Sequence, residues 1–172
     1  PLASYTKIAW VIRTNTATAS NNILSGGTGT NDHVLWMSNN NGTTLSAGNN
    51  NNWNYVMDPS PTPINTWSLV AVTYDATSLS MFLYRDGTLV NQALGTVPVQ
   101  PNGNATYIGA WSAGNTFQGQ IDEAQLSAVP RSSNWLWACW QNQGYNSSFN
   151  TYTPTFGIRN LSITNLTSVS AT

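Results

Sequence analysis

The stretch from Trp67 to Leu126 constrains the fold most, because it carries short apolar runs separated by turn signals. It opens with a β-branched run, Trp67–Asp75, which is typical of a strand buried on both faces. A second run, Leu79–Tyr84, leads into Asp86-Gly87, a pair that suits the positive φ values of a two-residue hairpin. Two more runs complete the series, at Thr106–Trp111 and Phe117–Leu126. The pattern predicts an antiparallel, all-β domain.

Taken in order, these runs resemble the LamG-like jelly roll of the concanavalin A-like lectin/glucanase superfamily. The matching segments are Trp67–Asp75, Tyr84–Gly87, Tyr107–Ala110 and Gly119–Ala124, preceded by Tyr5–Val11, which resembles an early strand of the family. One short motif would be weak, but four in the same order and spacing are specific. The resemblance implies two antiparallel sheets packed as a jelly-roll sandwich. Such a fold does not by itself define a chemistry.

We expect one jelly-roll domain over residues 1–148, since 172 residues can enclose a sizeable core. One short helix is predicted from Ser133 to about Gln141, with Ser132 or Ser133 as its N-cap. It resembles a helix that family members carry at this place, and we expect it to cover an edge or an end of a sheet. Its three tryptophans, which we expect to be packing or surface groups, are Trp135, Trp137 and Trp140.

Residues 149–172 form a Thr/Ser/Asn-rich tail with strand-like character. Its apolar side chains are Ile158, Leu161, Ile163, Leu166 and Val169. Family members usually carry a further strand before the segment matched by Tyr5–Val11, so an unpaired sheet edge is expected. The tail either pairs within its own chain, leads as a linker into a following module, or is donated to a neighbouring copy of the chain by strand addition.

Charge is sparse, and polarity comes instead from 23 Asn and 22 Thr residues, which favour long hydrogen-bonding loops. Five Lys/Arg against six Asp/Glu give a net charge of −1, so the basic surface of a nucleic-acid-binding protein is not expected. No apolar run approaches the roughly 20 residues that cross a bilayer. Composition and resemblance together indicate an extracellular or cell-surface location; the single Cys139 adds nothing to that inference.

Catalysis is not expected. Glucanases of this fold use two carboxylates roughly 5 Å apart, and their signature places them on alternate residues of one strand. Glu123, the one glutamate, adjoins Asp122, and neighbouring strand residues should face opposite sides of the sheet. The one histidine, His33, has no local motif that would pair it with a nucleophile.

The sequence contains the residue types of a glycan-binding site, because sugar recognition needs flat aromatic faces beside amides and carboxylates. Residues 31–58 hold this mixture, and Trp53 and Tyr55 would share one face of a strand. The predicted ligand-binding residues are Asn31, Asp32, His33, Trp36, Asn51, Trp53, Tyr55, Asp58 and, at a separate loop tip, Trp111. The alternative is that Trp36 and Trp53 are ordinary sheet aromatics and that His33 is a satisfied loop residue.

A structural calcium ion is implied only by the resemblance. In related jelly rolls the Asp of the G-x-I-D motif commonly contributes to such a site, and the matching residue is Asp122. Calcium needs six to eight oxygen ligands, which carboxylates and backbone carbonyls can supply. The alternative is that Asp122 accepts hydrogen bonds from a neighbouring turn.

The leading functional hypothesis is therefore a non-catalytic, lectin-like module that binds a polysaccharide or other glycan outside the cell. The alternative is a structural subunit of a surface layer or filament, assembled from copies of the chain through the tail. A third possibility is protein adhesion through the same sheet face.

Overall fold

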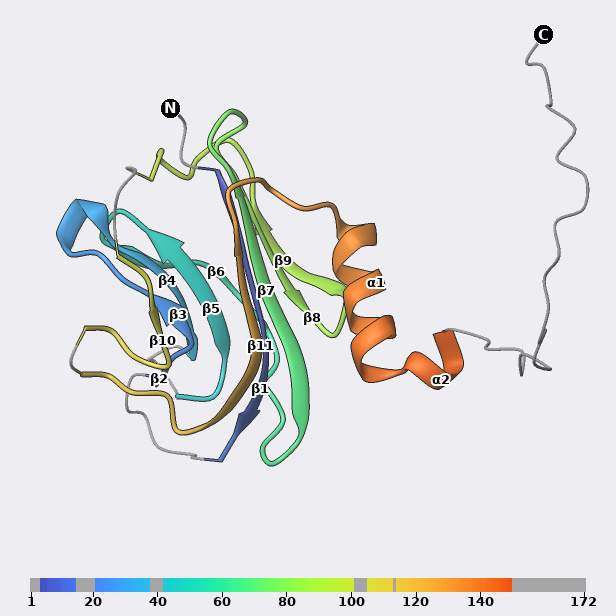
Figure 1. Ribbon diagram of the computed structural model, residues 1–172. Helices are drawn as coiled ribbons and strands as arrows, with labels where there is room; N and C mark the ends of the chain where they lie inside the picture. The colour runs from blue at the N-terminus through green and yellow to red at the C-terminus, as the bar shows by residue number, and fades with distance from the viewer. Residues whose placement is uncertain (1–3, 15–20, 38–41, 101–104, 113, 150–172) are drawn as a thin grey trace, which may run out of the picture.

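A computed structural model describes residues 4–14, 21–37, 42–100, 105–112 and 114–149, and the tail lies outside them apart from Phe149. Figure 1 shows three layers: a four-stranded sheet, a five-stranded sheet and a helix. The described strands are β1 Tyr5–Arg13, β2 Asn21–Asn22, β3 Leu24–Ser25, β4 His33–Met37, β5 Leu45–Asn49, β6 Asn52–Met57, β7 Trp67–Asp75, β8 Ser80–Arg85, β9 Thr88–Ala93, β10 Tyr107–Ile108 and β11 Gly119–Ser127. The helices are η1 Gly29–Asn31, α1 Ser133–Gly144 and α2 Asn146–Phe149.

The five-stranded sheet has the order β11-β1-β7-β8-β9 and is antiparallel throughout. Side chains of β7 alternate between its two faces: Val70 and Val72 enter the core between the sheets, whereas Leu69 and Ala71 enter a second cluster on the outer face. The prediction that Trp67–Asp75 is a strand buried on both faces is thereby confirmed over its central residues.

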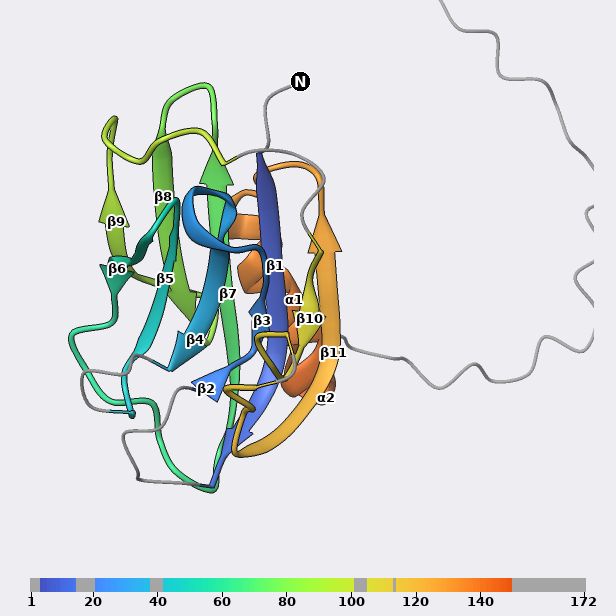
Figure 2. The same cartoon turned by 90° about the vertical axis from the view of Figure 1, so that its left-hand side faces the viewer.

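The four-stranded sheet has the order β2-β4-β5-β6 and faces the viewer in Figure 2. Leu35 and Met37 of β4, with Leu45 and Ala47 of β5, point into the core that the two sheets share. The strand considered for Trp53 and Tyr55 is present as β6, which begins directly after an Asn-rich turn. Asn50 and Asn51 have φ values of 52° and 66°, which make a tight turn between β5 and β6 that asparagine tolerates.

The Asp86-Gly87 hairpin is confirmed between β8 and β9. Asp86 has φ 52° and Gly87 φ 73°, as a turn with two left-handed central residues requires. The Asp86 carboxylate also accepts a hydrogen bond of 2.9 Å from the backbone N–H of Leu69, which ties the turn to β7.

Helix α1 begins as predicted, since the Ser132 hydroxyl accepts a hydrogen bond from the Trp135 N–H. It lies on the outer face of the five-stranded sheet, so the expectation that it would cover an edge or an end is wrong. The physical reason is the outer apolar cluster of Ile8, Leu69 and Tyr84, which needs a cover and receives Leu136, only 1% exposed. None of the three described helices is long and apolar enough to cross a membrane.

Candidate functional site

Asp32 lies near the start of the predicted segment, residues 31–58, and is completely buried. One carboxylate oxygen accepts from the backbone N–H of Asn51 at 3.0 Å, and the other accepts from the indole N–H of Trp53 at 2.6 Å. Short bonds of this kind to an ionised acceptor are among the stronger hydrogen bonds in proteins. Asp32 therefore fastens the β5–β6 turn to the start of β4.

Three of the predicted aromatic residues form a continuous cluster. Trp36 meets Trp53 edge-to-face at 5.8 Å between ring centroids, and Trp53 meets Trp111 in the same way at 4.9 Å. The indole N–H of Trp36 donates to the carbonyl of Trp53, and that of Trp111 donates to the carbonyl of Gly27. All three indole N–H groups are thus used inside the protein.

Gly48 explains how the cluster is held against the sheet. A Cβ at this position would lie 1.9 Å from the Asn52 carbonyl oxygen, so only glycine lets the start of β6 approach β5 so closely. The pairing of β5 with β6 shifts register between Ala47 and Asn49. Trp53 and Tyr55 consequently have different surroundings: Trp53 joins the tryptophan cluster, whereas Tyr55 packs against the main core.

His33 is buried beside Lys7, with its Nδ1 2.6 Å from the Lys7 Nζ. Lys7 Nζ donates to the Leu24 carbonyl, and His33 Nε2 lies 3.1 Å from the Ala105 carbonyl oxygen, so the neutral ring donates there and accepts from Lys7. Burial first, and the neighbouring lysine second, lower the pKa of His33 to about 3. Burial likewise holds the pKa of Lys7 well below its usual range.

The remaining predicted residues lie at opposite ends of the four-stranded sheet: Asn31 and Asn51 are by the β5–β6 turn, and Asp58 is beside Leu45 at the start of β5. Asp58 is buried and pairs with Arg85 at 2.7 Å. Asn31 and Asn51 are exposed, but the carbonyl of Asn31 accepts from Gln100 and the N–H of Asn51 is bound to Asp32. Ligand binding by residues 31–58 stays a prediction, and most of its polar atoms already serve the fold.

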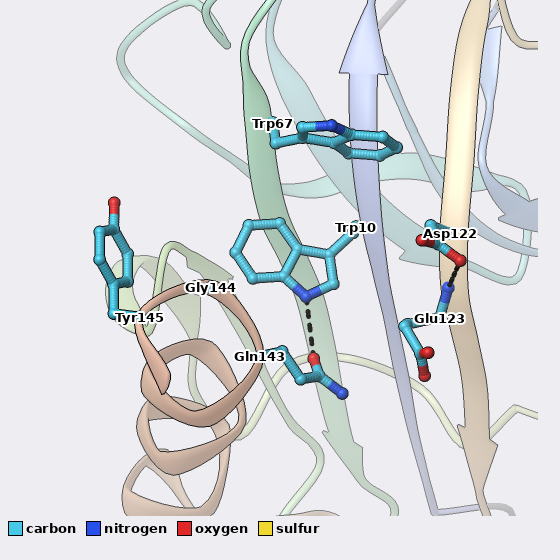
Figure 3. Close-up of a pocket in the computed structure, with 7 residues that line it drawn as sticks. All are labelled: Trp10, Trp67, Asp122, Glu123, Gln143, Gly144 and Tyr145. Carbon is cyan, nitrogen blue, oxygen red and sulfur yellow. Dashed lines mark hydrogen bonds between the residues drawn. The ribbon is translucent and has the colours of Figure 1, made fainter. Parts of the chain in front are cut away.

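A different group of the same residue types lies on the outer face of the five-stranded sheet, next to the end of α1. We call this cavity of about 580 Å³ the helix-end pocket. Figure 3 shows the seven residues that line it, Trp10, Trp67, Asp122, Glu123, Gln143, Gly144 and Tyr145. Trp67 is 41% exposed and Tyr145 50%, and both carboxylates are exposed to solvent.

A β-bulge places both carboxylates in this pocket. Trp10 of β1 pairs with Asp122, but Ile8 pairs with Gln125, so β11 holds one residue more than β1 between these two pairs. Glu123 takes φ 49° at the bulge, and its N–H donates to the Asp122 carboxylate at 2.9 Å. The prediction that Asp122 and Glu123 face opposite sides of the sheet is therefore wrong, because strict alternation fails at a bulge.

The pocket wall is built from elements far apart in the chain. The indole N–H of Trp10 donates to the Gln143 side-chain oxygen at 2.8 Å, which links β1 to the last turn of α1. Gly144 packs against the same indole, since a Cβ on it would lie 2.7 Å from the Trp10 ring. Trp10 lies on an outward-facing position of β1, but the sequence offered no sign that the helix would end over it.

The calcium ion implied at Asp122 stays a prediction. Calcium takes six to eight oxygen ligands, and the helix-end pocket offers two carboxylates and an amide whose oxygen already accepts from Trp10. Among the described residues no three His, Cys, Asp or Glu side chains are grouped closely enough to hold a metal. The donor set is thus a poor fit for an ion held by the protein alone.

Solved structures share this architecture at low sequence identity. A candidate carbohydrate-binding protein from Bacteroides ovatus superposes with a TM-score of 0.66 and 23% identity, over 79% of this chain and 40% of that one. The CBM40 of the Ruminococcus gnavus IT-sialidase, solved with α2,3-sialyllactose, gives 0.61 and 19% over 80% and 82%. A heptameric SAP-like pentraxin from Limulus polyphemus gives 0.63 and 14% over 81% and 70%. At these identities the likeness shows the fold alone.

No curated protein matches the sequence. A family model does: the one described as the concanavalin A-like lectin/glucanases superfamily matches residues 1–136, most of the chain. The match ends within α1, so Gln143, Gly144 and Tyr145 of the helix-end pocket lie beyond it. Together with the sandwich of antiparallel sheets, it shows that the chain belongs to the concanavalin A-like lectin/glucanase superfamily.

Proposed function

We propose that this chain is a non-catalytic, lectin-like module that binds a glycan in the helix-end pocket. One observation carries the proposal: the pocket combines exposed aromatic rings with exposed carboxylates and an amide, and the predicted segment does not. A pyranose ring offers a C–H face that packs on an indole, and hydroxyl groups that donate to carboxylates. Trp67, Tyr145 and the pair Asp122 and Glu123 supply these complementary groups.

Two neighbouring carboxylates raise the question of hydrolysis. A glycosidase needs one carboxyl group that keeps its proton, which an apolar, water-poor pocket normally provides. Asp122 and Glu123 are both exposed, and Asp122 is bonded to the adjacent N–H. The pocket lacks the dry surroundings of a general acid, which supports binding without turnover.

The test is affinity electrophoresis through gels that contain a neutral polysaccharide (β-glucan, xylan or arabinan), an anionic one (pectin) or a cationic one (chitosan). We expect retardation in at least one gel. Trp67→Ala should abolish it, because an aromatic platform typically contributes a large share of weak binding energy. Trp137→Ala is the matched control, since Trp137 is 46% exposed on α1 and does not line the pocket.

Retardation that survives Trp67→Ala, or none in any gel, would contradict the proposal. The gels are run with calcium and with EDTA; the sparse donor set predicts the same retardation in both. An extracellular or cell-surface location accompanies the proposal, because that is where a glycan-binding module of this superfamily meets polysaccharide.

A second candidate function is favoured by the edge of the five-stranded sheet. Strand β11, nine residues from Gly119 to Ser127, is last in the strand order and pairs on one side with β1 among the described strands. An exposed edge of this length can accept a strand from a second copy of the chain. A subunit of a filament or surface layer would then be joined by residues 156–172.

Light scattering of the full chain and of a variant lacking residues 156–172 tests this candidate. Polymers that become monomers on deletion would support it, and a synthetic 156–172 peptide should then bind the truncated domain. A chain that is monomeric before and after deletion would overturn it.

A further inference from the structure

The electrostatics of the helix-end pocket select the kind of glycan it can hold. Two carboxylates line it, Asp122 and Glu123, and its other lining residues are uncharged. The cations among the described residues are engaged elsewhere: Lys7 at His33, Arg13 at the Thr62 carbonyl, Arg85 at Asp58, and Arg131 over the Trp135 ring. In the described part of the chain, neither pocket carboxylate is in an ion pair.

The end of α1 adds to this negative potential. Gln143 and Gly144 belong to the last turn of the helix and Tyr145 is its C-cap, so the pocket lies at the negative end of the helix dipole. No basic residue in the last turn offsets the dipole. The two carboxylates and the helix dipole therefore both make the electrostatic potential in the pocket more negative.

The aromatic rings also favour a positively charged ligand. Trp10, Trp67 and Tyr145 line the pocket together with the carboxylates, and Figure 3 shows Trp67 and Trp10 next to each other above Gln143. Aromatic faces carry partial negative charge and attract ammonium groups, most strongly at tryptophan. Three independent features thus favour a cation, and none of the lining side chains carries a positive charge.

We propose that the ligand of the helix-end pocket is a glycan that carries a protonated amine, as in polymers of glucosamine with free amino groups. This inference rests on the proposed function and names its substrate class. The amine lies against Asp122 and Glu123 while the sugar face packs on an indole. Acidic glycans are disfavoured, since a ligand carboxylate would face two protein carboxylates.

The experiment is isothermal titration calorimetry with three tetrasaccharides of equal backbone: the glucosamine tetramer, its N-acetylated form, and cellotetraose, which has a hydroxyl in place of each amine. At a pH where the amine is protonated, we expect the glucosamine tetramer to bind about ten-fold or more tightly than either neutral sugar. Rising salt should weaken its binding and narrow that difference.

Variants of the pocket residues test which side chains cause the preference for the amine. Glu123→Gln, alone and combined with Asp122→Asn, should remove the preference for the amine, and both residues are exposed, so folding should be retained. Asp75→Asn is the matched control: it removes a carboxylate at the last residue of β7, Asp75 does not line the pocket, and the variant should keep the preference. Equal or tighter binding of a neutral tetramer, lost in Trp67→Ala, would overturn the inference and leave the lectin proposal intact.

A small cation, tetramethylammonium, separates the two proposals. If it binds in an Asp122- and Glu123-dependent manner while no sugar does, the pocket selects cations and the lectin proposal is overturned. If neither it nor any tetrasaccharide binds, both proposals are overturned.

Discussion

The tryptophan cluster around Asp32 and the helix-end pocket contain the same residue types and differ in what those residues are bonded to. At Asp32 both carboxylate oxygens and the indole N–H groups of Trp36, Trp53 and Trp111 are used within the fold. At the helix-end pocket the rings of Trp67 and Tyr145 and two carboxylates remain exposed. Residue type alone does not make a site; the hydrogen bonds already made decide how much is left for a ligand.

Trp36→Ala should give the largest loss of stability if the cluster is structural. The side chain is 1% exposed and donates to the Trp53 carbonyl, so its removal leaves a cavity and takes away one of the donors to that carbonyl. We expect a loss of about 3 to 5 kcal/mol in the free energy of unfolding, measured by urea denaturation. A loss below about 1 kcal/mol would contradict the structural role, and Trp137→Ala serves as the exposed comparison.

Asp32→Asn changes few atoms but replaces an acceptor by a donor. One amide nitrogen would then face either the Asn51 N–H or the Trp53 indole N–H, so a hydrogen bond is lost and a donor is left unpaired. We expect a cost of roughly 1.5 to 3 kcal/mol by the same denaturation assay. Wild-type stability in this variant would show that Asp32 is available for a ligand after all.

Acidification should weaken the protein through His33, the one histidine of the chain. Its pKa falls from 6.5 to about 3 on folding, so below pH 6.5 the unfolded chain binds a proton that the folded chain does not. Through this group stability should then fall by up to about 1.4 kcal/mol per pH unit as pH decreases from 6.5 toward 4.5. In His33→Gln the slope over this window should flatten; an unchanged slope would show that His33 is not its source.

Trp67→Ala should have the smallest effect on stability, within about 0.5 kcal/mol, because the ring is substantially exposed at the start of β7. Asn51→Gly is its counterpart in the predicted segment: glycine accepts the φ of 66° and keeps the N–H bonded to Asp32. In affinity electrophoresis Trp67→Ala should lose glycan retention and Asn51→Gly should keep it. The opposite outcome would move the site to residues 31–58.

Much of the fold could be predicted from local patterns. The β-branched run of β7, the Asp86-Gly87 turn and the cap at Ser132 each depend on neighbouring residues, and each is where the sequence indicated. The bounds of strand β6 were harder to predict, because asparagine is rare in strands and the start of β6 is held by the close approach at Gly48 rather than by its own propensity.

The binding site was harder to predict for a physical reason. The sequence predicted that Asp32, Trp36 and Trp53 belong to one site. Which of their polar atoms stay available to a ligand depends on the hydrogen bonds formed in the folded protein, and the sequence does not show these. The helix-end pocket joins four distant elements, and its two carboxylates share it only through the bulge at Glu123. Of its lining residues, the sequence singled out Asp122 alone as a site residue, and for a metal.

The indole region of a ¹H–¹⁵N spectrum tests the comparison most directly, because each of the eight tryptophans gives one signal. Signals are assigned with single Trp→Phe variants, and an oligosaccharide of the polysaccharide that retards the protein is then titrated in. We predict that the Trp10 and Trp67 signals shift on binding while those of Trp36, Trp53 and Trp111 stay in place. Shifts at Trp53 and Trp111, with Trp10 and Trp67 unmoved, would contradict the assignment of the glycan to the helix-end pocket.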